Sequence, residues 1–201
     1  MRMTLASKIR RMLGKKTKVS PKLLGYGMVS LAAQHFESLE KADVLPEAVD
    51  REALLFELLR AYFCFASLWL GSHIQDNTTL NRYGASMLEE LRLYPDELGD
   101  LVRGAFSDVV ALDDAIAWYV RDTPSDKDRA AIQENRQLLG LSEDNHLHFF
   151  AGKVHIRTMR IANVDKRMMT MEFMQAWITT ATLLTETVKS FFSEIVRVFV
   201  E

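Results

Sequence analysis

The sequence predicts an all-α protein: a single bundle of about six to eight helices, preceded by a short basic amphipathic helix. All four prolines stand where a helix can begin, in the first helical turn or just before it. Two long stretches repeat apolar residues at spacings of three and four, the period of a helix with one buried face. With 201 residues, 48% hydrophobic and 26% charged, the chain can bury a substantial core.

The first 20 residues form a separate arm in this prediction. Over residues 1–13, apolar residues recur at i, i+4, i+7 and i+8, and the basic residues lie largely off that stripe. The stripe consists of Leu5, Ile9, Met12 and Leu13. Residues 14–20 show no periodicity and are typical of a linker. We therefore divide the chain into a basic amphipathic arm with its linker, residues 1–20, and a helical bundle domain, residues 21–201.

Three helices are predicted in the first half of the bundle. The first covers residues 21–41 and has one apolar face, which includes His35. The second covers residues 46–74 and is apolar on almost every side, which is typical of a helix at the centre of a bundle. The third covers residues 80–92 and follows an Asp-Asn-Thr-Thr cap at residues 76–79.

Residues 95–119 show the clearest helical period in the sequence. Their apolar residues alternate by three and four, with one slip, over about seven turns. This pattern predicts one long amphipathic helix with one buried stripe. The stripe consists of Leu98, Leu101, Ala105, Val109, Leu112, Ile116 and Tyr119.

Three more helices complete the predicted bundle. Residues 124–139 form a polar helix, and residues 142–163 form the next one. The last helix has apolar spacings of three and four over 178–199, although five threonines in its first part make a short strand a competing prediction. We expect the core to come from the helices over 46–74 and 95–119 together with this last helix.

The single cysteine and the N-terminal residues predict a reducing, cytoplasmic environment. Cys64 lies among aromatic residues, where we expect it to be buried, and one thiol forms no internal disulfide. No apolar segment near the N-terminus fits a secretory signal, and no window supplies the roughly 20 uninterrupted apolar residues of a membrane span. An acid-free N-terminus with arginine and serine is also typical of a mitochondrial transit peptide, which stays an alternative.

The histidines do not predict a metal site. His148 and His155 share a helix face but lie about 10 Å apart along its axis, too far for adjacent ligands of one ion. Glu143 and His146 form one Glu-x-x-His pair, whereas a di-iron bundle needs two. The sequence has no phosphate-binding glycine loop, no Cys-x-x-Cys and no nucleophile spaced for a histidine base. We expect no metal, no cofactor and no catalytic residue, which favours a non-enzymatic protein.

Two places in the predicted core are candidates for a polar ligand pocket. Small and polar residues form one narrow stripe on the helix over 46–74: Glu57, Arg60, Cys64, Ser67 and Gly71. We favour a solvent-facing stripe with an ordinary ion pair between Glu57 and Arg60; the alternative is an inward-facing stripe that lines a pocket. His35 is the second candidate, although a hydrogen-bonded core histidine is the simpler interpretation.

The distribution of charge is the strongest functional signal. Residues 1–22 carry eight bases and no acid, whereas residues 23–201 carry 17 bases and 27 acids. We expect such an arm to meet membrane headgroups, nucleic acid, a protein partner or the chain's own acidic surface, with a solubilising tail as the alternative. Its interleaved apolar residues favour a membrane surface or a partner groove over nucleic acid. The candidate anion-binding residues are Lys8, Arg10, Arg11, Lys15, Lys16 and Lys18.

Together these features predict a non-enzymatic interaction or regulatory protein, cytoplasmic and peripheral at a membrane. The apolar residues near the C-terminus need a docking surface, either on the bundle or across a homodimer, and we favour the homodimer. They are Val196, Val198, Phe199 and Val200. The alternative from another functional class is a helical bundle that binds a small-molecule ligand, or an enzyme, with a polar pocket centred on Glu57 and Arg60 or on His35.

Overall fold

The fold consists of helices throughout the part of the chain that the structure describes, which confirms the all-α prediction. This computed structural model describes residues 21–73, 76–93, 96–121, 125–138 and 146–164, together with a few positions between 170 and 182. The predicted N-terminal helix and linker lie outside these ranges, as does most of the predicted C-terminal helix. The apolar C-terminal residues also lie outside these ranges, so the homodimer expected from them stays a prediction.

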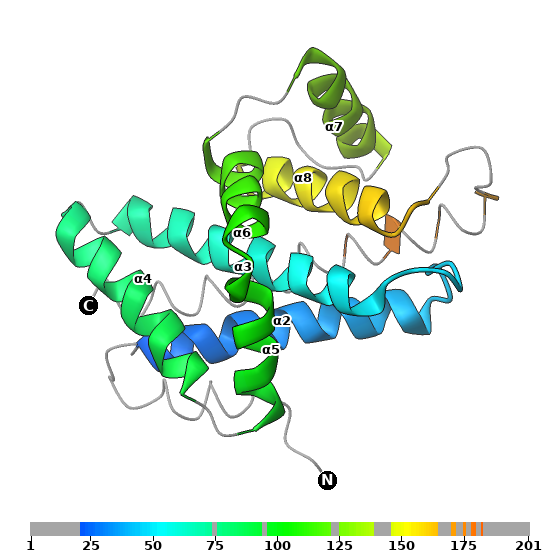
Figure 1. Ribbon diagram of the computed structural model, residues 1–201. Coiled ribbons are helices and arrows are strands. Elements are labelled where there is room, and N and C mark those ends of the chain that lie inside the picture. Colours follow the sequence, from blue (N-terminus) through cyan, green and yellow to red (C-terminus); the bar gives the residue numbers. More distant parts are fainter. Residues whose placement is uncertain are drawn as a thin grey trace, which may run out of the picture.

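Helix α3 (Arg51–His73) is the centre of the bundle, as its all-round apolar sequence predicts. Helix α2 (Pro21–Lys41) packs along it, and α4 (Asn77–Arg92) packs against both near one end (Figure 1). Among the described helices, α3 alone is long and apolar enough to cross a membrane by length and composition. Its central position explains that composition, because a helix enclosed by others needs apolar side chains on every face.

The second half of the described chain wraps around α3. Helices α5 (Glu97–Ser107) and α6 (Val109–Ile116) cross in front of α3 in Figure 1, and a π-helical turn, η1 (Ala117–Arg121), follows them. Helix α8 (His146–Ile161) packs on a further side of α3. The polar helix α7 (Asp126–Leu138) packs against α8.

Helix α3 begins later than the position of Pro46 predicts. Asp50 caps it, because its Oδ1 accepts a hydrogen bond from the backbone N–H of Ala53 at 3.0 Å. Pro46 instead opens a turn in which its carbonyl accepts from the N–H of Val49 at 3.0 Å. The segment before α3 packs into a small second core, whose buried members are Leu39, Val44, Leu54, Met159 and Ala162.

The single long helix predicted over 95–119 is interrupted at Asp108. This residue leaves the helical conformation, with φ −80° and ψ 97°, and its side chain caps α6 by accepting from the N–H of Ala111 at 3.0 Å. The interruption turns Val109 away from the predicted buried stripe, so that it is 73% exposed. The slip in the apolar period, two successive spacings of four, falls at this point in the sequence.

Helix α8 belongs to the main core, which the sequence did not predict. Phe150 and Val154 on α8 pack in one cluster with residues of α2, α3, α4 and α5. The polar residues Lys153, His155 and Thr158 are buried on the same helix. These polar residues interrupt the apolar pattern of α8, so its central role is not evident from hydropathy. The expected contributions of the helices over 46–74 and 95–119 are present as α3 and α5.

Candidate functional site

The polar stripe on α3 faces the protein interior for most of its length. Glu57 is 1% exposed, Arg60 is 7% exposed and Cys64 is buried, whereas Ser67 is half-buried and Gly71 is exposed. The favoured interpretation of this stripe as a solvent-facing edge was therefore wrong. Because α3 is apolar on every other side, its hydropathy pattern does not predict which face of the helix is buried.

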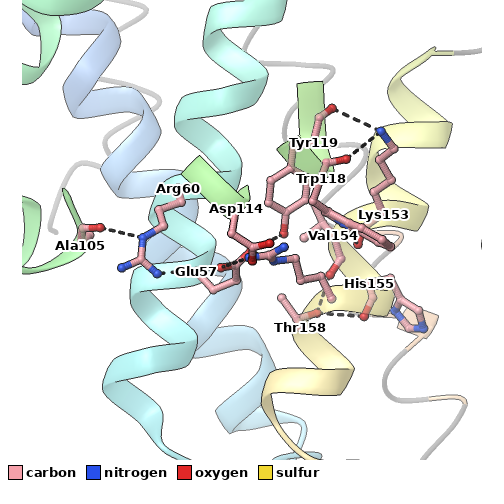
Figure 2. A network of polar contacts seen from close by, with 11 residues as sticks. Glu57, Arg60, Ala105, Asp114, Trp118, Tyr119, Lys153, Val154, His155 and Thr158 are labelled. Atoms are coloured by element: carbon pink, nitrogen blue, oxygen red, sulfur yellow. Dashed lines mark hydrogen bonds and ion pairs between the residues drawn. The ribbon is translucent and has the colours of Figure 1, made fainter. Parts of the chain in front are cut away.

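Glu57 is the centre of a buried polar cluster, shown in Figure 2. Its Oε1 accepts a hydrogen bond from the Tyr119 hydroxyl at 2.8 Å and lies 2.5 Å from Nε of Arg157. Its Oε2 accepts from Nη2 of Arg157 at 3.4 Å and lies 3.9 Å from Nη1 of Arg60. Both carboxylate oxygens therefore have partners, supplied by η1, α8 and α3 itself.

Burial and ion pairing shift the pKa values of Glu57 and Arg157 in opposite directions. Loss of hydration raises the pKa of the Glu57 carboxyl, while Arg157, Tyr119 and Arg60 lower it less strongly. The same loss of hydration raises the pKa of the Tyr119 hydroxyl, and the neighbouring Glu57 adds to that rise. For Arg157, burial lowers the pKa, but Glu57, Tyr119 and Asp114 together raise it by more, so the net pKa is raised. Tyr119 and Arg157 thus keep their protons as donors to Glu57.

The two arginines extend the cluster to other helices. Nε of Arg60 donates to the backbone carbonyl of Ala105 on α5 at 2.7 Å. Nη2 of Arg157 donates to Oδ2 of Asp114 on α6 at 2.6 Å, and its guanidinium lies 5.7 Å from the centre of the Tyr119 ring. The buried carboxylate of Glu57 on α3 is thereby linked to four other elements: α5, α6, η1 and α8.

Lys153 forms a second polar contact between α8 and the π-helical turn. Its Nζ donates to the carbonyl of Trp118 at 2.9 Å and to that of Tyr119 at 3.4 Å. In return, Nε1 of Trp118 donates to the carbonyl of Lys153 at 3.3 Å. A π-helical turn leaves carbonyl groups without their usual i+4 partner, and Lys153 satisfies two of them (Figure 2).

The sequence named only part of this cluster. Glu57 and Arg60 were candidates, but Tyr119, Asp114, Lys153 and Arg157 were not. Arg157 could have been noticed, because it follows Val154 by three residues, as Val154 follows Phe150 by four. All three residues therefore lie on the buried stripe of the same helix. The pairing of Arg157 with Glu57 could not have been predicted, because 100 residues separate the two in the sequence.

His35 lies in a different part of the core from Glu57. It is 7% exposed on α2, and its ring meets that of Tyr62 edge-on with the centres 6.3 Å apart. Tyr62 follows Glu57 by five residues on α3 and so points about 140° away from it. The structure therefore separates His35 from the other two pocket candidates.

Two buried polar atoms around His35 lack a hydrogen-bond partner among the described residues. They are Nδ1 of His35 and the hydroxyl of Tyr62. Burial lowers the pKa of His35 to about 3, and the neighbouring His155 contributes to that shift, so the ring is neutral at physiological pH. The predicted hydrogen-bonded core histidine is thus buried as expected, but its Nδ1 is unpaired.

Metal ligands are not clustered in the part of the chain that the structure describes. No group of three or more His, Cys, Asp or Glu side chains there is arranged to hold an ion. Glu143 lies outside the described ranges, and nothing is described of the side chains of His146 and His148. The arm residues Lys8, Arg10, Arg11, Lys15, Lys16 and Lys18 also lie outside.

Comparison with known proteins adds no relative: the chain matches no family model, and no curated protein or solved structure matches it significantly. The functional interpretation therefore depends on the contacts and charges of this chain. Two features carry it, the closed ionic cluster around Glu57 and the division of charge between the arm and the bundle.

Proposed function

We propose that the protein is a non-enzymatic interaction protein that attaches peripherally to an anionic surface, a membrane above all, through its basic N-terminal arm. The observation that carries this proposal is the division of charge. Eight bases and no acid occupy residues 1–22, and the remaining chain has an excess of ten acids. Lys and Arg side chains close to an anionic membrane each contribute about 1 kcal/mol of attraction.

The exposed carboxylates of the bundle support an orientation for this attachment. Asp96, Glu97, Asp100, Asp113 and Asp126 lie exposed on α5, α6 and α7 or at their first turns. An anionic surface repels these groups and attracts the arm. We infer that the arm contacts the surface while the acidic helices face away from it.

The buried cluster around Glu57 supports a structural role for the charged groups of the core. The carboxylate of Glu57 is bound by Tyr119 and Arg157, and the guanidinium of Arg60 is bound by the carbonyl of Ala105. Groups with such partners hold helices in position, as a buried ion pair does when its hydrogen bonds are satisfied. On this proposal, external partners meet the surface of the bundle and the arm.

Co-sedimentation with vesicles tests the proposal. The full chain is compared with a variant that carries Lys8→Gln, Arg10→Gln and Arg11→Gln, at low salt with phosphatidylserine-containing vesicles. Loss of three charges should weaken binding about 100-fold. A matched variant, Lys41→Gln, Arg51→Gln and Arg82→Gln, removes three exposed bases from the bundle and should bind like the parent. Equal binding by all three proteins would refute the proposal.

A small polar ligand bound in the core is the second candidate function, and one observation favours it. The rings of His35 and Tyr62 are in edge-on contact, and Nδ1 of His35 and the hydroxyl of Tyr62 are buried without hydrogen-bond partners among the described residues, a cost of about 1–3 kcal/mol each. Absorbance and metal analysis of the purified protein test this candidate. A chromophore or stoichiometric metal, lost in a His35→Leu variant, would support it; a colourless, metal-free protein would leave binding by the arm as the better account.

A further inference from the structure

Helix α7 is the most polar of the described helices and lies at the edge of the bundle. Six of its 13 residues are charged, and Ile132 alone among its described side chains is buried. Figure 1 shows α7 on the outer side of α8, away from α2, α4 and α5, and its contacts are concentrated on α8. Little apolar surface therefore holds α7 on the bundle.

An ion pair adds to this attachment one helical turn before Ile132. Nη2 of Arg160 on α8 binds Oδ1 of Asp128 on α7, and we call this contact the α7 latch. On its other side the Arg160 guanidinium lies 5.3 Å from the centre of the Trp118 ring on η1. Ser125 holds the carboxylate of Asp128 in place, because its Oγ donates to Oδ2 at 2.7 Å and accepts from the Asp128 N–H at 3.2 Å.

The rest of the described bundle is packed without α7. Neither core cluster of the described residues includes a residue of α7, so the packing of α2–α6 and most of that of α8 stays in place if α7 leaves. A helix of 13 residues is marginal in water when it stands alone. Once it leaves α8, α7 should therefore lose its helical hydrogen bonds as well.

We propose that α7 is a flap that undocks from α8 and unfolds while the rest of the bundle stays folded, and that the α7 latch controls how often this happens. The proposal does not depend on the proposed function of the arm. Undocking uncovers the surface of α8 beneath α7 and leaves the Arg160 guanidinium beside Trp118 without the carboxylate of Asp128. A carboxylate or phosphate group that binds this guanidinium would compete with Asp128 and favour the open form.

Native-state amide hydrogen exchange of the full chain tests the flap. After correction for intrinsic rates, we expect the amides of residues 130–138 to exchange at least about 100-fold faster than those of residues 55–70 on α3. An Asp128→Asn variant keeps an acceptor for Ser125 but loses the charge that binds Arg160. A matched Asp126→Asn variant loses an exposed acid from the same helical turn. Exchange of α7 should be about fivefold faster in Asp128→Asn than in Asp126→Asn, with that of α3 unchanged.

Three outcomes would count against this account. Equal protection of α7 and α3 in the parent would overturn the flap, because α7 would then open only when the whole protein unfolds. Equal exchange of α7 in the two asparagine variants would overturn the role of the latch. An Ile132→Ala variant should speed exchange of α7 at least about tenfold while α3 stays protected. Loss of protection in α3 as well would show that α7 belongs to the main core.

Discussion

Two buried tyrosines of α3 and η1 differ in what their hydroxyl groups contact. Tyr119 donates to Glu57 at 2.8 Å, whereas the hydroxyl of Tyr62 has no hydrogen-bond partner in the described part of the chain. A buried hydroxyl with a charged acceptor stabilises the fold, and one without an acceptor destabilises it through lost hydration. The two residues therefore form a natural comparison, since the same substitution removes the same atom from each.

Replacement of each tyrosine by phenylalanine should have opposite effects on stability. Tyr119→Phe is expected to lower the free energy of unfolding by about 1.5–3 kcal/mol, because Glu57 loses a donor while it stays buried. Tyr62→Phe should leave that free energy unchanged or raise it by up to about 1 kcal/mol. Urea denaturation of the two variants and the parent measures both effects. A larger loss for Tyr62→Phe than for Tyr119→Phe would contradict the assignment of the cluster.

The neutral state of His35 predicts a loss of stability in acid. Its pKa is about 3 in the folded protein against 6.5 as the ordinary value, so the unfolded chain takes up a proton more readily. The stability that His35 contributes is complete above pH 6.5 and falls toward pH 3, by about 1.4 kcal/mol per pH unit. A His35→Leu variant should show a flatter profile over this range in denaturation measured at several pH values. Identical slopes for variant and parent would show that His35 is not buried as a neutral ring.

Glu57 acts on the other side of the pH profile. Because burial raises its pKa above 4.5, its contribution to the free energy of unfolding is complete below pH 4.5 and is lost as the pH rises through the pKa of the folded protein.

The sequence identified Glu57, Arg60 and His35 as the unusual polar residues of the predicted core. It could not show which of them have partners, since those partners come from Tyr119 and Arg157, far along the chain.

At the scale of helices, the packing of α2 on α4 depends on a residue without a side chain. A Cβ atom at Gly25 would lie 2.7 Å from Cδ1 and 2.9 Å from Cγ of Leu91. The two helices approach this closely because glycine leaves room for the leucine. Gly84 on α4 is different, because a Cβ atom there would meet nothing within 4 Å.

Alanine at these two glycines should therefore shift stability in opposite directions. Gly25→Ala is expected to destabilise the protein by about 1–3 kcal/mol, since α2 and α4 must separate or Leu91 must leave its rotamer. Gly84→Ala should stabilise it by up to about 1 kcal/mol, because alanine favours the helix and meets no neighbour. Thermal and urea unfolding of both variants test this; a stabilising Gly25→Ala would show that α2 and α4 are not packed as described.

The helices whose ends carry clear capping or turn signals are those that the sequence predicts best. Helix α2 has the predicted bounds, and α4 ends at Arg92 as predicted. Helix α4 begins at Asn77, three residues before the predicted start at residue 80, because Asp76 alone caps it. The interruption at Asp108 was missed, because the apolar period continues across it with only one irregular step. The π-helical turn was missed as well; its carbonyls at Trp118 and Tyr119 accept hydrogen bonds from Lys153 on α8, a contact that the local sequence does not show.

For the whole molecule, the sequence predicts the fold class and the unequal distribution of charge, and the structure adds where the charged groups of the bundle lie. The buried charges around Glu57 are paired within the protein, and the exposed ones on α5–α7 are mainly acidic. An acidic bundle with a basic N-terminal arm is suited to attachment at an anionic surface through the arm. This division of roles is the central claim of the proposed function.

Binding of the full chain to vesicles of graded composition tests that claim most directly. We predict that affinity rises with the fraction of phosphatidylserine in a phosphatidylcholine background, and that it falls steeply as salt is raised from about 0.05 M to about 0.5 M. Both trends should vanish in the Lys8→Gln, Arg10→Gln, Arg11→Gln variant. Binding that is the same on neutral and anionic vesicles, or that does not respond to salt, would contradict the account.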